Sequence, residues 1–260
     1  MSVQLEALAD EVFDAAAAQA RLGSQSRRLP YGEAIWNPNY PDLYFLNGIG
    51  SLVAPDWSVN DLEQGILGIM PGVRAFRAIS RDPQTIASLG PKLSSAGYEH
   101  EVRVGMVQVT VPSEVNASRF SIRRVDDERS WEDYAGTLDA DGAEHGSSPA
   151  MAAQLLALYR WRSKHTPTSY YLAVDGSRAI GHVGLFQHGA TGYLHGLFTR
   201  PESRRQGAAA ALTMAMASES RAMGCNRLTL QCIDDGHLPR YYQTLGFRTV
   251  GEQHIWTKRW

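Results

Sequence analysis

The sequence predicts an α+β protein in which a mixed, mostly antiparallel central sheet is flanked by helices. Its clearest support is a meander of three strand-like segments, 169–176, 178–189 and 191–200, joined by an Asp-Gly turn and then a glycine-rich turn. Connections this short make neighbouring strands antiparallel. Helical patterns come before and after the meander, so we expect helices to cover the sheet that it begins.

Composition limits the kind of protein and its partners. The 260 residues are 43% hydrophobic and 20% charged, enough to bury the core of one large domain or two small ones. A net charge of −2 predicts neither nucleic acid nor a membrane as partner, and no apolar run is long enough to span a bilayer. We therefore expect a cytoplasmic protein, with monomer and homodimer both left open. The two cysteines, Cys225 and Cys232, do not form a metal-binding pattern, so no metal is expected.

The first half of the chain predicts fewer elements. A helix with apolar residues at helical spacing covers about 5–16, and 73–80 is a short strand candidate. Residues 82–97 predict a helix with an aspartate cap and a proline at its first position, and 98–111 predict one strand or two. The stretch 31–57 is rich in aromatics and prolines, which is typical of an ordered surface crossing.

A polar, turn-rich stretch then marks a boundary. We predict an N-terminal domain at 1–112, a linker at 113–119 and a second domain at 120–260. The second domain predicts the element order β, α, α, βββ, α, β, α, ββ. Its elements are a strand at 120–125, an acidic helix and loop at 127–142, a helix at 148–165, the meander, a helix from 208, a strand at 226–233, a helix at 237–245 and two closing strands in 247–260.

Positive charge precedes the alanine-rich helix in an unusual way. Arg204 and Arg205 stand in the last turn before it, followed by Gln206 and Gly207. A helix start normally prefers a side-chain oxygen or a negative charge, because its first N–H groups are unpaired and its dipole is positive there. Arginines at this position indicate that an anion binds between them and the amides.

Two motifs together resemble the GNAT superfamily of acyl-CoA N-acyltransferases. Arg204–Ala209 satisfies its Gln/Arg-x-x-Gly-x-Gly/Ala signature, and Tyr242–Phe247 its Tyr-x-x-x-Gly-Phe ending. The resemblance covers about 120–260 and implies a GNAT fold with acetyl-CoA as cosubstrate, whose pyrophosphate is the expected anion. The cofactor-binding residues it implies are Leu197, Phe198, Thr199, Arg204, Arg205, Gln206, Gly207, Ala208 and Ala209.

The resemblance also implies catalytic roles. Tyr242 matches the tyrosine that protonates the departing thiolate; the alternative is that its ring only packs. His195 lies two residues before Leu197 on one strand face, so we predict that it is the base and titrates near neutral pH. The alternative is a strand histidine that only hydrogen-bonds a neighbour.

Other residues are expected to border the acceptor. Tyr193 shares the face of His195 and could hold a water in the proton path. Glu144 and His145 are the fallback for the base, in a predicted loop at 139–146 whose acidic residues could attract a cationic amine or simply be solvated.

The first half resembles a degenerate second copy, because a helix ends at Gly97 before a strand much as another does at Gly246. It lacks the arginine-glycine loop: 65–80 stands roughly in its place, without the charge and without a helix. We therefore expect one acyl-CoA site. Trp36, Tyr40 and Tyr44 are either walls of the acceptor pocket or ordinary core.

These observations predict an N-acetyltransferase that moves the acetyl group of acetyl-CoA to a primary amine of a small molecule within a ternary complex. An amino sugar, a polyamine and an amino acid derivative all remain open as acceptors, as does an acyl group longer than acetyl. Two alternatives remain: a non-catalytic acyl-CoA-binding module, and an acetyltransferase that acts on a protein amine.

Overall fold

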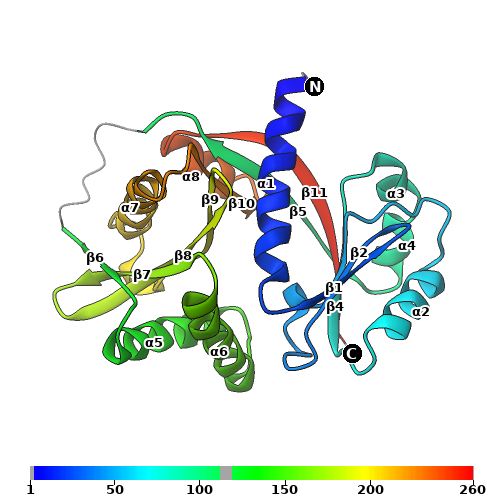
Figure 1. Cartoon of the computed structure of the whole chain (residues 1–260), viewed down its shortest axis with the longest axis horizontal. Helices are drawn as coiled ribbons and strands as arrows, with labels where there is room; N and C mark the ends of the chain where they lie inside the picture. Colours follow the sequence, from blue (N-terminus) through cyan, green and yellow to red (C-terminus); the bar gives the residue numbers. More distant parts are fainter. Residues whose placement is uncertain (1–2, 112–118, 260) are drawn as a thin grey trace.

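A single eleven-stranded sheet runs through the molecule (Figure 1). The computed structural model describes residues 3–111 and 119–259, so most of the predicted linker at 113–119 lies outside the described residues. The spatial order of the strands is β1-β2-β3-β4-β11-β5-β10-β9-β8-β7-β6. Two neighbouring pairs are parallel, β3 with β4 and β9 with β10, and the others are antiparallel. The predicted mixed, mostly antiparallel sheet is confirmed.

The element bounds follow the chain. The strands are β1 Gln25–Leu29, β2 Gly32–Trp36, β3 Gly48–Gly50, β4 Ala75–Ser80, β5 Glu99–Gln108, β6 Ser121–Arg124, β7 Thr168–Asp175, β8 Arg178–His188, β9 Thr191–Thr199, β10 Arg227–Ile233 and β11 Phe247–Arg259. The helices are α1 Val3–Arg21, α2 Val59–Ile69, α3 Pro83–Ser88, α4 Gly90–Ser95, α5 Glu128–Glu144, α6 Pro149–His165, α7 Ala208–Ala222 and α8 Leu238–Thr244, with single 3-10 turns at Tyr44–Leu46 and Pro201–Ser203.

Helices cover both faces of the second half of the sheet. On β7, Tyr171 and Ala173 pack in the core shared with α7, whereas Tyr170 and Leu172 pack in the core shared with α5 and α6. Alternate residues of a strand point to opposite faces, so α7 lies on one side of the sheet and α5 with α6 on the other. In the first half, a separate core joins α2, α3 and α4 to β2, β3 and β4.

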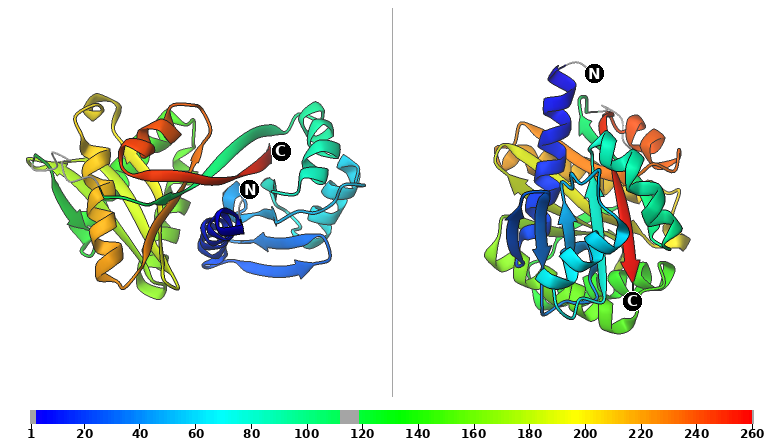
Figure 2. Two further views of the ribbon diagram at one scale, coloured as in Figure 1. Left: turned by 90° about the horizontal axis from the view of Figure 1, so that it is seen from above. Right: turned by 90° about the vertical axis from the view of Figure 1, so that its right-hand side faces the viewer.

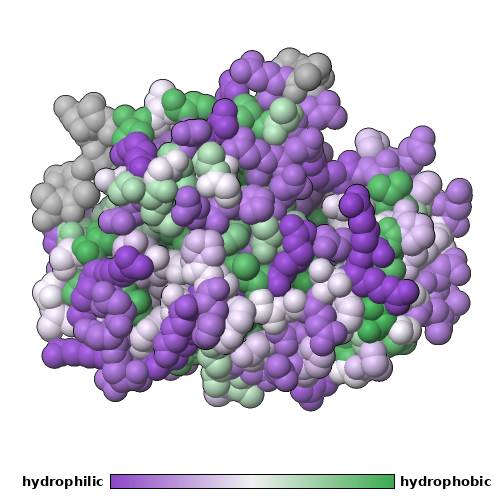
Figure 3. Space-filling view, viewed as in Figure 1, coloured by the Kyte–Doolittle hydropathy of each residue, from purple (hydrophilic) through white to green (hydrophobic). Residues whose placement is uncertain are grey.

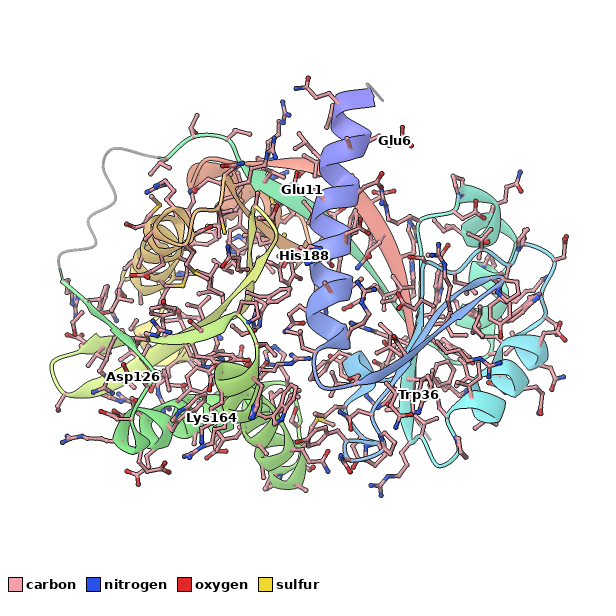
Figure 4. The ribbon with its side chains drawn as sticks, in the orientation of Figure 1. Glu6, Glu11, Trp36, Asp126, Lys164 and His188 are labelled. Carbon is pink, nitrogen blue, oxygen red and sulfur yellow. The ribbon has the colours of Figure 1, made fainter. Side chains whose placement is uncertain are left out.

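Helix α1 crosses the middle of the molecule between the two lobes (Figure 1). Val12 and Phe13 pack against Val107 of β5 and Val250 of β11. Ala15 and Ala18 pack against Phe186 of β8 and Tyr193 of β9. The outward face of its upper part is hydrophilic in Figure 3, whereas its small alanine side chains allow close approach to the sheet. In Figure 4 the labelled Glu11 lies on α1 on the side of the second half, where it pairs with Arg227 at 3.1 Å and accepts from Thr191.

The two halves share their central strands. β5 comes from the first half but lies between β10 and β11, and β11 comes from the second half but pairs with β4. Seen from above in Figure 2, both strands bridge the two lobes. The sheet is therefore continuous across the two predicted domains.

Several predicted elements need correction. Residues 247–260 are predicted as two closing strands, but 247–259 form one strand, β11, with a register shift between Thr249 and Gly251. The place where a second closing strand would pair with β10 is taken by β5. The stretch 31–57, predicted as a surface crossing, contains the short strands β2 and β3. Residues 141–144, predicted as part of a loop, form the last turn of α5, and residues 65–69, predicted as non-helical, belong to α2.

Candidate active site

Strands β9 and β10 run parallel but stay paired over only part of their length. The pairing joins Thr191–Leu194 of β9 to Arg227–Leu230 of β10. Beyond it, β10 continues beside β5 and β9 continues beside β8. The two strands separate, so the segment His195–Thr199 has no partner strand on its β10 side among the described residues. This separation opens the centre of the sheet to a ligand.

A bulge in β9 lies where the separation begins. Gly196 has φ +58°, and the pairing with β8 shifts register between His182 and Gly184. A left-handed residue of this kind favours glycine and redirects the peptide groups that follow. Those groups belong to Leu197, Phe198 and Thr199, which the sequence places at the thioester. Leu197 packs partly against the α7 core, Phe198 is buried, and the Thr199 hydroxyl is buried without a partner in the described structure.

The N-terminus of α7 has the backbone of an anion-binding loop. Arg205 has φ +59° and Gly207, the N-cap, has φ +94°. No side chain of the described residues caps the helix, so its first N–H groups are left for a ligand. Left-handed residues in such a turn direct successive amides into one concave surface, and the helix dipole adds positive potential. Ala208 is buried under the loop and Ala209 half-buried, which lets the helix start lie close to the sheet. These features fit the pyrophosphate of coenzyme A.

The side chains of the loop differ in their contacts. Nε of Arg204 donates to the Thr199 carbonyl at 3.1 Å, and its Nη2 forms an ion pair with Glu144 at the end of α5. Gln206 donates to the carbonyl of Glu202 at 3.3 Å, which closes the turn. Hydrogen bonding to Arg204 lowers the pKa of Glu144. Any anion that binds Arg204 therefore competes with a carboxylate that the chain already supplies.

Tyr242 lies on α8 with 7% of its surface exposed. Its ring contacts Phe247 with centroids 5.7 Å apart, and it belongs to the core that includes Leu230 and Cys232 of β10. Burial, with smaller contributions from Cys232 and two tyrosines, raises the pKa of Tyr242, so the phenol keeps its proton at neutral pH. A protonated phenol beside β10 can donate its proton, which is what the acid role needs.

His195 lies at the start of the separation, with its ring 6.2 Å from both Tyr159 and Tyr193 and 5.9 Å from Tyr170. Its Nε2 is buried and, within the described residues, has no hydrogen-bond partner. Burial, followed by the charges of Arg162 and His182, lowers the pKa of His195 to about 3. The expectation that this residue titrates near neutral pH is therefore wrong, because the aromatic surroundings disfavour its charged form. At neutral pH it is an uncharged imidazole with a free ring nitrogen.

Glu144 and His145 lie at the C-terminal end of α5. The helix extends through Glu144, whose carboxylate pairs with Arg204. His145 ends α5 and is largely exposed, with its Nδ1 2.9 Å from Asp141. Burial raises the pKa of Asp141, which also lies 3.7 Å from the buried His182. The acidic segment therefore contacts both the loop before α7, through Arg204, and its own helix end, through His145.

A cavity of about 390 Å³ opens beside His195, between the two halves of the molecule. Its lining joins His195, Gly196 and Tyr193 of β9 to Gln231 of β10 and to α1. Residues of β2, β3, β4, β5, β11, α6 and the adjoining loops complete it. Burial raises the pKa of Tyr193, so its phenol is neutral. Of the three aromatics considered for its wall, none lines it: Trp36 packs in the first-half core and Tyr40 beside the α5 and α6 core. Figure 4 labels Trp36 in the first-half lobe. Ile35, which precedes Trp36, and Phe45, which follows Tyr44, line the cavity instead.

Comparisons with known proteins decide the family. The model of the Acetyltransferase (GNAT) family matches residues 128–247. Residues 128–247 are a GNAT acetyltransferase domain. This domain supports an acyltransferase of the N-acetyltransferase type, and the family uses acetyl-CoA as its cosubstrate.

Solved structures share the fold over nearly the whole chain. A conserved protein of unknown function from Staphylococcus epidermidis is 14% identical with a TM-score of 0.69, over 91% of this chain and 94% of the other. A GCN5-related N-acetyltransferase from Kribbella flavida is 15% identical with a TM-score of 0.58, over 95% of each chain. A protein from Novosphingobium aromaticivorans described as belonging to the GNAT family is 18% identical, also with a TM-score of 0.58 over 95% of each chain. No curated protein matched this chain. The first half is thus part of an architecture found in other GNAT structures.

Sequence reasoning missed the first-half residues of the cavity. Arg77 of β4, Arg103 of β5 and Gln253 of β11 meet there only because β5 and β11 cross between the lobes. The available signal was charge inside two otherwise apolar strand patterns, Arg77 in "VRAFRAIS" and Arg103 in "EVRVGMVQV". Within the described part of the chain, no helix is long and apolar enough to cross a bilayer, and no group of three or more acidic, histidine or cysteine side chains forms a candidate metal site.

Proposed function

We propose that this chain transfers the acetyl group of acetyl-CoA to a primary amine of a small molecule, by direct attack within a ternary complex. The observation that carries the proposal is the cavity at the separation of β9 and β10, with His195 and Gly196 in its wall. A cavity of about 390 Å³ is in the range that encloses small molecules. Its lining from seven strands and two helices of both halves favours a small acceptor over the surface of a folded protein.

The proposed cosubstrate site lies at the end of β9 and the N-terminus of α7. The backbone amides of the loop would bind the pyrophosphate, together with the guanidinium groups of Arg204 and Arg205. These amides belong to Arg205, Gln206, Gly207, Ala208 and Ala209. On binding, Arg204 would give up its ion pair with Glu144 and pair with the pyrophosphate instead. The unpaired Thr199 hydroxyl and the peptide groups of Leu197 and Phe198 would face the thioester end, where an N–H would polarise the carbonyl.

In the proposed reaction, the amine nitrogen attacks the thioester carbonyl carbon. A carbon–nitrogen bond forms and the carbon–sulfur bond breaks. The nitrogen passes one proton to a water in the cavity and from there to solvent, while the departing thiolate takes one proton from Tyr242, whose phenolate is then reprotonated from solvent. His195 would accept a hydrogen bond from the amine through its free Nε2, and Tyr193 would hold the acceptor or a water beside it. Tyr242 would give its proton to the thiolate, the product that must be neutralised, because the phenol is protonated at neutral pH. Its raised pKa makes it a weaker acid than an exposed tyrosine.

We further propose that residues 1–112 are a degenerate second copy of the GNAT unit, so that the chain has one acyl-CoA site. The order β1-β2-β3-α2-β4-α3-α4-β5 parallels the order β7-β8-β9-α7-β10-α8-β11. In both, the third and fourth strands are parallel neighbours. Gly97 and Gly246 also share the left-handed conformation, with φ +80° and +82°, before the last strand of each.

The test uses the purified chain, acetyl-CoA, a panel of primary amines and a dye that detects free thiols. We expect amine-dependent release of free coenzyme A for at least one small amine. Nucleotide binding without release for any amine would contradict the enzyme proposal and favour a binding module. Release that requires a protein or peptide amine would contradict the small-molecule acceptor.

A further inference from the structure

The cavity beside His195 contains an arginine that the described residues do not neutralise. Three arginines line it: Arg81 pairs with Asp10 at 2.6 Å and Arg103 with Glu101 at 2.7 Å. For Arg77 of β4, no carboxylate of the described residues lies within ion-pair distance. Its Nη2 donates to the backbone carbonyl of Phe45 at 3.2 Å. Arg77 thus brings one positive charge into the cavity that is left for a ligand.

The acidic groups of the cavity wall are engaged elsewhere or lie at its rim. Glu33 pairs with Arg21 at 2.7 Å. Asp82 caps α3 by accepting from the amide and the hydroxyl of Thr85, both at 2.7 Å. Asp14 is exposed on α1. Burial and the neighbouring charge of Arg103 lower the pKa of Arg77 to about 10, which still leaves the guanidinium protonated at neutral pH.

A second, independent feature is an unpaired donor. Gln253 of β11 donates from Nε2 to Oε1 of Gln231 on β10 at 2.8 Å, which fixes the orientation of the Gln231 amide. Nε2 of Gln231 is buried and has no partner within the described structure. Both glutamines line the cavity. A buried N–H group without a partner is destabilising, so a ligand oxygen is the expected partner.

Tyr193 relates this cationic region to the proposed place of the amine. The charges of Arg77 and Arg103 both act on the Tyr193 hydroxyl. The same ring is stacked with His195 at 6.2 Å between centroids. Arg77 and His195 therefore both lie near Tyr193 and both line the cavity, which suits a small molecule that carries an amine and an anion.

We infer that the acceptor amine carries a carboxylate, which Arg77 and Gln231 bind while the amine lies at His195. This inference rests on the proposed function. One unneutralised guanidinium matches the single charge of a carboxylate, whereas a phosphate would leave a second charge without a partner in the cavity. The acceptors it selects are amino acids and related amino carboxylates, in preference to polyamines and neutral amino sugars.

The decisive experiment compares matched acceptors. Each α-, β- and γ-amino acid of a panel is assayed beside its carboxamide, which keeps the amine and the shape and loses the charge. For the acid that is used best, we expect kcat/KM to exceed that of its amide by about 10- to 100-fold. Calorimetric titration of the same pair into protein saturated with coenzyme A measures acceptor binding without turnover, and we expect the same preference there.

Variants locate the preference on Arg77. Arg77→Gln should remove most of the difference between acid and amide, chiefly through KM, and Arg77→Lys should retain part of it. Arg74→Gln is the matched control, because Arg74 is exposed, pairs with Asp42 at 2.8 Å and does not line the cavity. Equal losses for acid and amide in Arg77→Gln would show a structural role only and overturn the inference. So would equal use of acid and amide by the unmodified protein, or a preference for phosphorylated amines or polyamines.

Failure of the proposed function has a different signature. If no amine releases coenzyme A, the enzyme proposal is overturned, but the calorimetric comparison of acid with amide still decides whether the cavity selects a carboxylate. An acid that binds no better than its amide then overturns the inference as well.

Discussion

Helices α2 and α7 occupy corresponding places in the two halves, but their N-termini are built differently. At α2, Ser58 accepts from the amide of Asp61 at 3.2 Å and the Asp61 carboxylate accepts from the amide of Ser58 at 2.8 Å, which completes a capping box. At α7, Gly207 takes the cap position and no described side chain binds the free amides. Side chains of α2 satisfy the first amides of that helix, whereas the first amides of α7 have no side-chain partner among the described residues, which fits the proposed anion site.

The same contrast recurs one helix later. Tyr242 stands four residues before Gly246, and Leu93 stands four residues before Gly97. Leu93 is fully buried and packs in the first-half core, whereas the Tyr242 phenol lies beside β10. If the proposed duplication and the proposed role of Tyr242 hold, one scaffold carries chemistry in the second half and only packing in the first, through changes at a few positions.

The largest effect on activity is expected for a change at Tyr242. Tyr242→Phe keeps the ring that packs on Phe247 and removes the proton that the proposed mechanism gives to the thiolate. We expect kcat to fall by about 10- to 1000-fold while the dissociation constant of acetyl-CoA hardly changes. Steady-state kinetics and calorimetry together measure both. Weaker coenzyme A binding with an unchanged kcat would instead give the hydroxyl a binding role.

Charge at the α7 loop comes next. Arg204→Glu replaces a guanidinium next to the proposed pyrophosphate by a carboxylate, so we expect acetyl-CoA to bind about 10- to 100-fold more weakly by calorimetry. Glu144→Gln should change acetyl-CoA affinity in the opposite direction, because it releases Arg204 from its ion pair. Since exposed ion pairs are worth at most about 1 kcal/mol, this variant should tighten binding by no more than about fivefold. Unchanged affinity in Arg204→Glu would remove the pyrophosphate from this loop.

His195 gives a test through pH. Because burial lowers its pKa to about 3, His195 stays neutral from pH 6 to 9, and any low-pH limb of kcat/KM in that range belongs to another group, such as the amine itself. We expect His195→Gln to lower kcat/KM about tenfold at every pH in this range without moving the limb. A limb that shifts or flattens in the variant would mean that His195 titrates near neutrality after all.

The same shift has a consequence for stability. The folded-state pKa lies below the ordinary value of 6.5, so the unfolded chain binds the extra proton first as the pH falls. This contribution to folding is complete above pH 6.5 and is lost toward pH 3. Thermal unfolding of the parent should therefore lose stability between pH 6.5 and 5 to a greater extent than that of His195→Gln.

The smallest effect is expected at the α2 cap. Ser58→Ala removes one half of the capping box and should lower the free energy of unfolding by about 1 kcal/mol. Acetyl-CoA affinity and kcat should not change, because the α2 terminus is proposed to bind no ligand. Chemical denaturation measures the first and calorimetry the second. A loss of acetyl-CoA affinity in this variant would indicate that the first half takes part in nucleotide binding.

Much of the second half could be predicted from its sequence, because local signals there agree with the fold. Ser148 caps α6 as expected, the meander forms β7, β8 and β9, and Gly207 begins α7 with a left-handed conformation. The short strands β1, β2 and β3 were missed because three to five residues carry little periodicity. The single closing strand could not be predicted either, since its second neighbour, β5, comes from far away in the chain.

The candidate site divides in the same way. The α7 loop was predictable because its residues are contiguous, whereas the ion pair of Arg204 with Glu144 spans 60 residues and depends on where α5 ends. The lowered pKa of His195 arises from aromatic side chains of β7 and α6, Tyr170 and Tyr159, that no spacing in β9 reveals. Arg77 reaches the cavity only through the order of strands in the sheet.

The exchange of β5 and β11 also constrains how the chain is made. A ribosome releases β4 early, but the strand that pairs with it, β11, consists of the last residues described, 247–259. Until they emerge, β4 has an open edge, and β5 lacks both of its neighbours. The sheet of the first half therefore cannot complete its pairing until residues 247–259 have been synthesised. Deletion of these residues would leave the edge of β4 unpaired and prone to aggregation.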